Sequence, residues 1–423
     1  MSQKLFGKRF RTGPKQEGTR VAFLGHFGKD NLGNESTLQA ILYQLRRLLP
    51  DAKFACICTG PEATATTHNI TAVPISRPLF RASTLHNGIA KLLRSLFIGV
   101  PSELYRWLEA FMTLKGTDVF IVPGTGLLTD AYGVRGWGPY STFKWSVVAK
   151  MRGCKLLFIS VGAGPIYGRL SRFLVRSALA LADFRSYRDV RSMRYVESIG
   201  FVPTSDQVFP DLVFSLPQTV IPHENTSKNP KCVVGLGLME YAGRYSVAKP
   251  SPTTYRNYLE NLVIFASWLL TRGYDVRLLI GDSGDRAVVE DFRSLLNGRL
   301  SIHDFGRIID EPAASVEQLL SQLAATDIVV ATRFHNVLLA LLLNKPVISI
   351  SFHHKCASLM SQMGLSEYCQ DINDLKGDRL IEQFCRLEKN AGSLGPMIRQ
   401  QVEECRKALD DQYHLILQDL EAR

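Results

Sequence analysis

The 423-residue sequence lacks several features that identify common classes of protein. No apolar run approaches the roughly 18 residues that a membrane-spanning helix needs. The richest run, VLLALLLNKPVISISF at 337–352, is interrupted by Asn344, Lys345 and Pro346. The first twenty residues contain no apolar stretch of about 7 to 15 residues, so they do not resemble a secretory signal. We therefore expect neither a membrane-spanning nor a secreted protein.

Cysteine is scarce and is poorly arranged for metal binding. The eight cysteines include no CxxC pair and no Cys/His cluster with zinc spacing. Several lie in apolar runs such as FACIC (54–58), where a thiol is usually a small buried hydrophobe. This pattern favours the reducing cytoplasm and predicts no metal site.

Acidic residues are fewer than basic ones, and the formal net charge of +11 points to an anionic partner. Residues 1–20 hold six basic side chains and one acidic one, and residues 169–194 hold seven arginines and two aspartates. We interpret residues 1–19 as a flexible basic tail, with anchoring to a membrane surface or polymer as the alternative. No nucleic-acid-binding motif accompanies the charge, so we do not expect a nucleic-acid partner.

The chain is long enough for two or three domains at about 100 to 200 residues each. Short β-branched runs alternate with longer amphipathic ones, which is typical of βαβ units in a parallel sheet. We predict two Rossmann-like, doubly wound α/β domains at 20–205 and 231–395, a proline-rich linker at 206–230 and a C-terminal helix at 396–423. This is the organisation of the GT-B type of glycosyltransferase fold, whose ligands bind between the domains.

Residues 79–114 interrupt the alternation and predict two amphipathic helices. The plainer interpretation is a helical insertion packed on the first sheet. The alternative is a basic, amphipathic surface that contacts a membrane or a lipid-linked substrate.

Three glycine-containing turns follow predicted strands of the first domain, at 25–36, 122–130 and 160–166. Each glycine could merely allow a tight turn, and Asn34 could be a helix N-cap, but carboxyl ends of parallel strands meet at one edge of a sheet. The first turn has neither GxGxxG nor P-loop spacing. The three turns together predict a ligand site, with these candidate binding residues: Asn31, Gly33, Asn34, Gly124, Gly126, Gly162 and Gly164.

Polar side chains stand at further strand ends. Arg188 follows the strand in FRSYRD, and Arg333 and His335 follow the strand DIVVATR. Arginine offers a planar fork of donors for phosphate or carboxylate, and histidine can act as an acid or a base. Lys355 follows the next strand, beside two histidines that have no further ligand at metal spacing.

Taken in order, these segments resemble the polysaccharide pyruvyl transferase family over about residues 20–365. The resemblance rests on the following stretches: NxG at 31–33, PGTGLLTD at 123–130, SVGAGPI at 160–166, SYRDVRS at 186–192, FPDLVFSL at 209–216 and TRFHNVLLALLLNKPVISISFHHK at 332–355. Two departures are Asn34, where many members carry Asp, and Pro-Gly-Thr-Gly at 123–126, where three consecutive glycines are common.

The resemblance implies a GT-B-like fold and transfer of pyruvate from phosphoenolpyruvate onto two hydroxyls of a sugar, which forms a cyclic ketal. It also implies that Arg188, Arg333 and His335 occupy the phosphoenolpyruvate-binding positions. We expect His335 to be the general acid or base and Lys355 to be a secondary phosphate contact. No cofactor or metal ion is expected.

The partners expected are phosphoenolpyruvate and a saccharide acceptor, either free in a polymer or linked to a lipid. The expected location is the cytoplasm, with peripheral contact at the inner face of the membrane. The sequence leaves the acceptor sugar and the oligomeric state open. Two alternative functions are a GT-B glycosyltransferase that uses a nucleotide sugar and a non-catalytic binding protein of an envelope-assembly complex.

Overall fold

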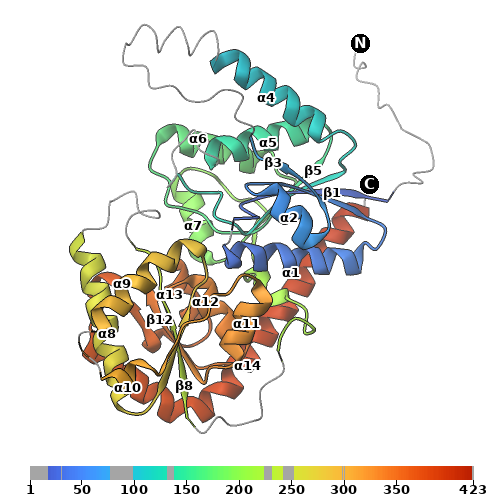
Figure 1. Cartoon of the computed structure of the whole chain (residues 1–423). Coiled ribbons are helices and arrows are strands. Elements are labelled where there is room, and N and C mark those ends of the chain that lie inside the picture. Colours follow the sequence, from blue (N-terminus) through green and yellow to red (C-terminus); the bar gives the residue numbers. More distant parts are fainter. Residues whose placement is uncertain are drawn as a thin grey trace, which may run out of the picture.

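The computed structural model of the chain describes residues 18–29, 31–76, 99–130, 138–222, 231–241, 252–297, 299 and 301–421. These residues form two parallel sheets with helices on their faces, one above the other in Figure 1. The strand orders are β3-β2-β1-β4-β5-β6-β7 and β10-β9-β8-β11-β12-β13. The predicted fold class, two doubly wound α/β units, is therefore confirmed.

The first sheet is built from strands whose centres are almost entirely apolar. All residues of β4 and β5 are buried, as expected for central strands of a parallel sheet with both faces covered. Its strands are β1 (Arg20–Gly25), β2 (Lys53–Cys58), β3 (Thr71–Pro74), β4 (Val119–Pro123), β5 (Lys155–Val161), β6 (Phe184–Tyr187) and β7 (Gln207–Val208). The accompanying helices are α1 (Leu32–Leu48), α2 (Pro61–His68), α4 (Val100–Thr113), α5 (Pro139–Met151), α6 (Arg169–Ala180), α7 (Val190–Ser198) and the 3-10 turn η2 (Leu212–Ser215).

The second sheet follows the same pattern, and its strands β8 and β12 are entirely buried. Its strands are β8 (Val233–Gly237), β9 (Asp275–Leu279), β10 (Ile308–Ile309), β11 (Ile328–Ala331), β12 (Val347–Ser351) and β13 (Cys369–Asp371). Its helices are α8 (Pro252–Thr271), α9 (Arg286–Asn297), α10 (Ile302–Phe305), α11 (Val316–Ala324), α12 (Phe334–Leu342), α13 (His354–Gln362) and α14 (Gly377–Glu421), with 3-10 turns η3 (Ser283–Asp285), η4 (Ser366–Tyr368) and η5 (Ile372–Asp374).

The C-terminal helix differs from the prediction. We expected a helix from residue 396, but α14 begins at Gly377, within the predicted second domain, and continues through Pro396. A proline inside a helix costs one backbone hydrogen bond. Here Leu387 and Ile398 on either side are fully buried, so packing outweighs that loss.

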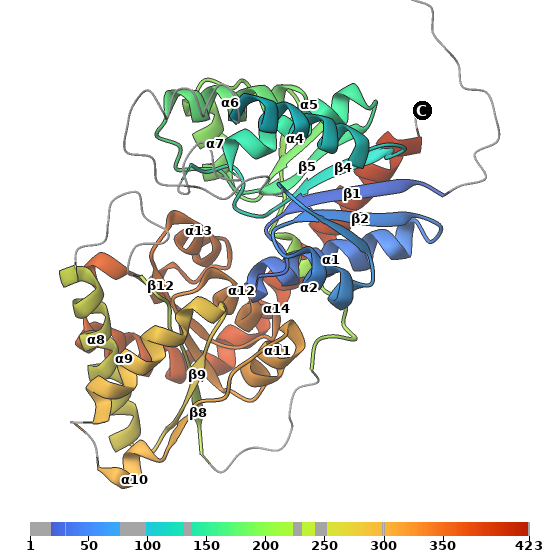
Figure 2. The same ribbon diagram turned by 45° about the horizontal axis from the view of Figure 1, so that its top comes forward.

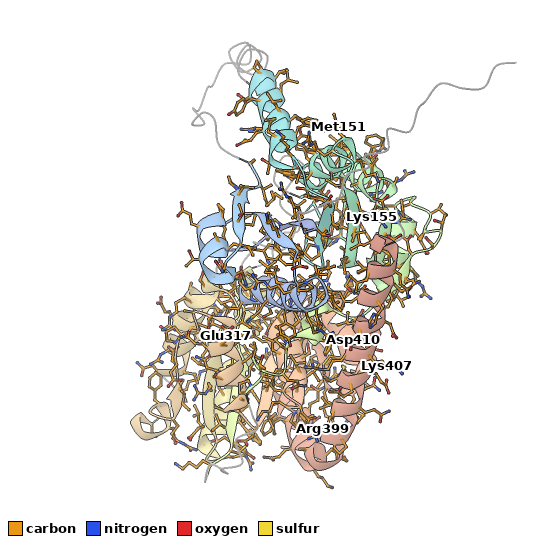
Figure 3. The ribbon with its side chains drawn as sticks, turned by 90° about the vertical axis from the view of Figure 1, so that its right-hand side faces the viewer. Met151, Lys155, Glu317, Arg399, Lys407 and Asp410 are labelled. Atoms are coloured by element: carbon orange, nitrogen blue, oxygen red, sulfur yellow. The ribbon has the colours of Figure 1, made fainter. Side chains whose placement is uncertain are left out.

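The far end of α14 reaches the first sheet. Gln412 accepts a hydrogen bond from Ser186 Oγ at 2.7 Å, and Lys155 Nζ lies 2.7 Å from Asp419 Oδ2. Figure 3 shows α14 rising past Arg399 and Asp410 toward Lys155. One helix thus fastens the two sheets together.

The predicted linker also differs from the prediction. We expected a loop-like segment at 206–230, but β7 joins the first sheet and η2 is fully buried. The side chain of Asp211 caps η2 by accepting from Val213 N at 3.1 Å. A single hydrophobic cluster runs from the α1 side of the first sheet through η2 into the second domain. The domains therefore share one core, because the apolar residues of this proline-rich stretch fill the space between them.

Two other predicted segments are described only in part. The second helix predicted within 79–114 is α4, which packs on α5. The first helix lies outside the described residues, as do residues 1–17 of the predicted tail.

Candidate active site

A cavity of about 540 Å³ lies between the two domains, at the carboxyl ends of both sheets. It is lined by the loops after β1, β4, β5 and β6 of the first domain and after β9, β11 and β12 of the second. Ligands in open α/β sheets bind at this edge. Every site residue predicted from sequence lines this cavity: Asn31, Gly33, Asn34, Gly124, Gly126, Gly162, Gly164, Arg188, Arg333, His335 and Lys355.

Three helices begin at the cavity. The N-caps of α1, α12 and α13 are Asn31, Arg333 and His353, and all three line it. The first turn of a helix presents unpaired N–H groups and a partial positive charge, which favour a bound anion. The helix N-termini and the basic side chains of the cavity therefore both favour a bound anion.

Arg188 is held between the domains. Its Nη1 lies 3.2 Å from Asp211 Oδ2, and its guanidinium stacks over the ring of Phe334 in the second domain at 4.7 Å from the centroid. A Cβ at Gly162 would lie 2.6 Å from Arg188 Nη2, so a larger residue there would displace the guanidinium. The glycine turn after β5 thus makes room for this arginine.

Arg333 is paired with a buried carboxylate. Its Nε and Nη2 donate to the two oxygens of Asp285 at 2.7 and 2.6 Å, and its Nη1 lies 3.7 Å from Asp282 Oδ2. Burial raises the pKa of the Asp285 carboxyl, although the hydrogen bonds from Arg333 oppose that shift. This bidentate pair fixes the direction of the guanidinium and compensates much of its charge.

Lys355 has a different environment. Its Nζ lies 5.4 Å from the ring centroid of Phe334 and 5.2 Å from that of Phe352, and it forms no ion pair with a carboxylate among the described residues. Burial lowers the pKa of the Lys355 ammonium to about 8, and the charge of Arg188 acts in the same direction. Of the three predicted cations Arg188, Arg333 and Lys355, the one with the least charge compensation is therefore Lys355, which was predicted as a secondary contact.

His335 stands on the first turn of α12 against Gly33 of α1. A Cβ at Gly33 would collide with the imidazole Nδ1, so this close approach requires glycine. His335 Nε2 is buried and has no hydrogen-bond partner among the described atoms. The pKa of His335 is lowered to about 4, chiefly by burial; the charge of Asp211 opposes this shift, and the charges of Lys355 and Arg188 contribute to it. The imidazole is neutral at pH 7 and can accept a proton.

Asn31 links the domains at the cavity. Its side chain caps α1 by accepting from Asn34 N at 3.1 Å, and its Nδ2 donates to Asp282 Oδ2 at 2.8 Å. The alternative that Asn34 caps this helix is therefore wrong, because Asn34 Nδ2 instead donates to the carbonyl of His26 at 3.0 Å. The first-domain loop is thus held against the acidic residue that also faces Arg333.

Sequence reasoning missed the acidic residues that orient Arg333. Asp282 and Asp285 lie shortly after β9, at the same edge as Arg333, so their position was a usable signal. Asn336 was also missed; its amide is fully buried, lines the cavity and makes no hydrogen bond among the described atoms.

Two further features are absent from the described ranges. Within them, no group of three or more His, Cys, Asp or Glu side chains is arranged to hold a metal ion. Likewise, no helix in the described part of the chain has both the length and the apolar character needed to cross a bilayer.

The sequence is similar to a known family and to a distant curated relative. Residues 31–354 match the family described as polysaccharide pyruvyl transferase. The chain is also 21% identical over 317 residues to the amylovoran biosynthesis protein AmsJ of Erwinia amylovora, which covers 73% of each protein.

Comparison with solved structures finds the same two-domain fold at low sequence identity. A UDP-GlcNAc 2-epimerase from Neisseria meningitidis matches with a TM-score of 0.57 and 11% identity, covering 95% of this chain and 100% of the other. A glycosyltransferase from Rickettsia africae matches with a TM-score of 0.57 and 10% identity, covering 96% and 99%. MurG of Acinetobacter baumannii matches with a TM-score of 0.51 and 11% identity, covering 95% and 99%. At such identities the likeness shows a GT-B-like fold alone.

Proposed function

Because the chain belongs to the polysaccharide pyruvyl transferase family, we propose that it transfers pyruvate from phosphoenolpyruvate onto two hydroxyls of a sugar, forming a cyclic ketal. The acceptor is part of an exopolysaccharide or of a cell-envelope saccharide precursor. The observation that carries the proposal is the interdomain cavity, in which Arg188, Arg333 and Lys355 meet three helix N-termini. Phosphoenolpyruvate is a small trianion, and this cavity has the charge to bind it.

Lys355 and Arg188 are the main anion-binding groups in this proposal. Lys355 has no carboxylate partner among the described residues, and Arg188 Nε, 3.8 Å from Asp189 Oδ2, is buried and makes no hydrogen bond among the described atoms. Both therefore retain unsatisfied donors for a phosphate or carboxylate oxygen. Arg333, held by Asp285, supplies a fixed donor with less net charge. The aromatic ring of Phe334 contacts both Arg188 and Lys355 and helps to hold each of them at the cavity.

The reaction begins with proton transfer to the methylene carbon of phosphoenolpyruvate, which becomes the methyl group and leaves an oxocarbenium-like centre at C2. One sugar hydroxyl adds to C2 and loses its proton, inorganic phosphate leaves with the electrons of the C2–O bond, and the second hydroxyl closes the ketal. The positive groups of the cavity stabilise the departing phosphate.

His335 moves the protons. In the empty site the low pKa of His335 keeps the imidazole neutral, so its unprotonated nitrogen is available to accept a proton from a sugar hydroxyl. Binding of a trianion offsets the charges of Lys355 and Arg188, so the pKa of His335 rises and the imidazolium becomes able to donate. The same residue can then serve as acid and base in successive steps.

The test is incubation of the protein with phosphoenolpyruvate and candidate saccharides, polymeric and lipid-linked, followed by mass spectrometry and measurement of released phosphate. We expect one pyruvyl ketal per phosphate released. A His335→Ala variant with an unchanged circular dichroism spectrum should lose this activity; ketal formation at the wild-type rate would refute the assignment.

The fold shared with glycosyltransferases supports a second candidate, transfer from a nucleotide sugar. That function requires tight binding of a nucleoside diphosphate. Thermal-shift measurements with phosphoenolpyruvate and with nucleoside diphosphates separate the two, because only the true donor class should raise the melting temperature strongly. A non-catalytic binding protein would release no phosphate with any acceptor.

We also propose that the reaction requires no divalent ion or cofactor, because the cavity's own cations and helix termini can neutralise the donor. Activity should survive dialysis against a chelator. The proposed location is the cytoplasm, where phosphoenolpyruvate is available, with peripheral contact at the inner membrane face.

A further inference from the structure

Large apolar side chains are exposed on one side of the first domain. On α4, Val100, Leu104, Leu108 and Met112 follow each other at intervals of four residues and are between 50 and 65% exposed. Residues at this spacing lie on one face of a helix. The face that packs on the domain carries the buried Ser102 and Ala110, and Trp107 and Phe111, at its border, are partly buried against the core. The exposed stripe is therefore not needed for the fold.

Helix α6 shows a related pattern with added charge. Leu170 and Phe173 are 57 and 59% exposed, and they are interleaved with Arg169, Arg172 and Arg176. The helix contains no acidic residue, and none of the three arginines forms an ion pair within the described residues. Its inward face, including Leu174 and Val175, is buried.

The two helices lie on the same side of the molecule. Both pack against α5, and Figures 1 and 2 show α4, α5 and α6 together on the side of the first domain that faces away from the second domain. Met151 at the end of α5 is also exposed and is labelled near α4 in Figure 3. We define the α4–α6 face by its outward residues: Val100, Leu104, Leu108, Met112, Leu170, Phe173, Arg169, Arg172 and Arg176.

We propose that the α4–α6 face binds an anionic lipid membrane. Exposed apolar side chains can insert at the boundary between head groups and acyl chains, while arginines remain at the level of anionic head groups. Each basic residue near such a surface adds to the attraction. A protein partner would need acidic groups matched to three particular arginines, whereas an anionic bilayer supplies negative charge everywhere along the face.

The position of α6 connects this face to the cavity. The loop immediately before α6 contains Gly162, Gly164 and Pro165, which line the cavity. A molecule docked through this face would be concentrated at the membrane, where a lipid-linked acceptor resides. The proposed membrane contact does not depend on the proposed function. Only its role in bringing the protein to a lipid-linked acceptor rests on that function.

The experiment is sedimentation of the full chain with vesicles of phosphatidylcholine alone or with added phosphatidylglycerol. We expect binding at least about tenfold stronger to the anionic vesicles, decreasing as salt is raised. The double variants Leu104→Glu/Leu108→Glu and Leu170→Glu/Phe173→Glu should each lose most of this binding. These side chains are exposed, so the variants should fold.

A matched control is Ile264→Glu/Leu295→Glu, which changes exposed apolar residues of α8 and α9 in the second domain. It should bind vesicles like the wild type. An Arg169→Gln/Arg172→Gln/Arg176→Gln variant should lose the preference for anionic vesicles while keeping ketal formation with a soluble saccharide.

Three results would overturn the proposal: no binding by the wild type, equal loss in the control, or persistent binding in both double variants. A wild-type dimer in solution that these variants convert to a monomer would instead identify the face as an interface between two copies of the chain. Loss of vesicle binding with intact ketal formation would support the membrane contact, whereas absence of ketal formation in every protein would count against the proposed function alone.

Discussion

Two cations of the same cavity, Arg333 and Lys355, are held in opposite ways. Arg333 makes a bidentate contact with the buried carboxylate of Asp285, whereas Lys355 lies against aromatic rings and has no carboxylate partner among the described residues. A paired cation is fixed in direction but gives up much of its charge, while an unpaired one keeps its charge for a ligand. Arg333 is therefore suited mainly to positioning, and Lys355 is suited mainly to binding the ligand.

The largest expected effect is on stability, from Arg333→Met. The change leaves the carboxylate of Asp285 buried without its partner, so the free energy of unfolding should fall by about 3 to 5 kcal/mol. Denaturant unfolding measures it. Adding Asp285→Asn removes the unpaired charge and should restore part of the loss; if the single variant is as stable as the wild type, the positioning role is refuted.

Lys355→Met should behave in the opposite way. Removing a desolvated charge that has no carboxylate partner should leave stability unchanged or increase it. Loss of a charge-assisted contact should weaken phosphoenolpyruvate binding about 10- to 150-fold. Isothermal titration calorimetry measures the Kd, and an unaltered Kd would show that Lys355 does not bind the donor.

An effect of similar size is expected from Gly33→Ala, which tests the other side chain without a partner, His335. The added methyl group would lie 1.9 Å from the imidazole Nδ1, so the ring must move by about 1 Å or more, and kcat should fall about 100-fold. Donor binding should change little. The matched control is Gly126→Ala in the same cavity, where a Cβ meets nothing within 4 Å.

The smallest expected effect is the pH dependence of donor binding, which is slight near pH 7. The pKa of Lys355 is lowered to about 8, so the ammonium is charged below that pH and loses its proton above it. The Kd for phosphoenolpyruvate should therefore be flat from pH 7 to 8 and then rise about tenfold per pH unit. In Lys355→Met the rise above pH 8 should be absent, whereas its persistence would assign the titration to another group.

Much of the cavity could be predicted because its residues follow strands. Glycine turns and polar residues at strand ends identify one edge of a parallel sheet, and residues as distant as Asn31 and Lys355 meet there. The pairing of Arg333 with Asp285 could not be predicted in this way, since it depends on β9 and β11 both lying beside β8. The low charge compensation of Lys355 could not be predicted for the same reason: compensation of charge is a property of neighbours in space.

The segments between domains were harder to predict. The prolines around 210–222 suggested a loop, yet Leu212 and Phe214 are buried in the shared core. Similarly, Pro396 suggested a helix start, but α14 continues through it. In both cases tertiary packing decided the conformation against a local signal.

The shared core limits where this chain can be joined to a relative to make a hybrid protein. A crossover placed in the segment between the two sheets would separate η2 and α1 from the second-domain side chains that bury them, and would part α14 from Ser186 and Lys155. Acceptor preference should therefore be exchanged by grafting loops onto an intact scaffold, and not by swapping halves. Although the chain has two sheets, it should be engineered as a single unit.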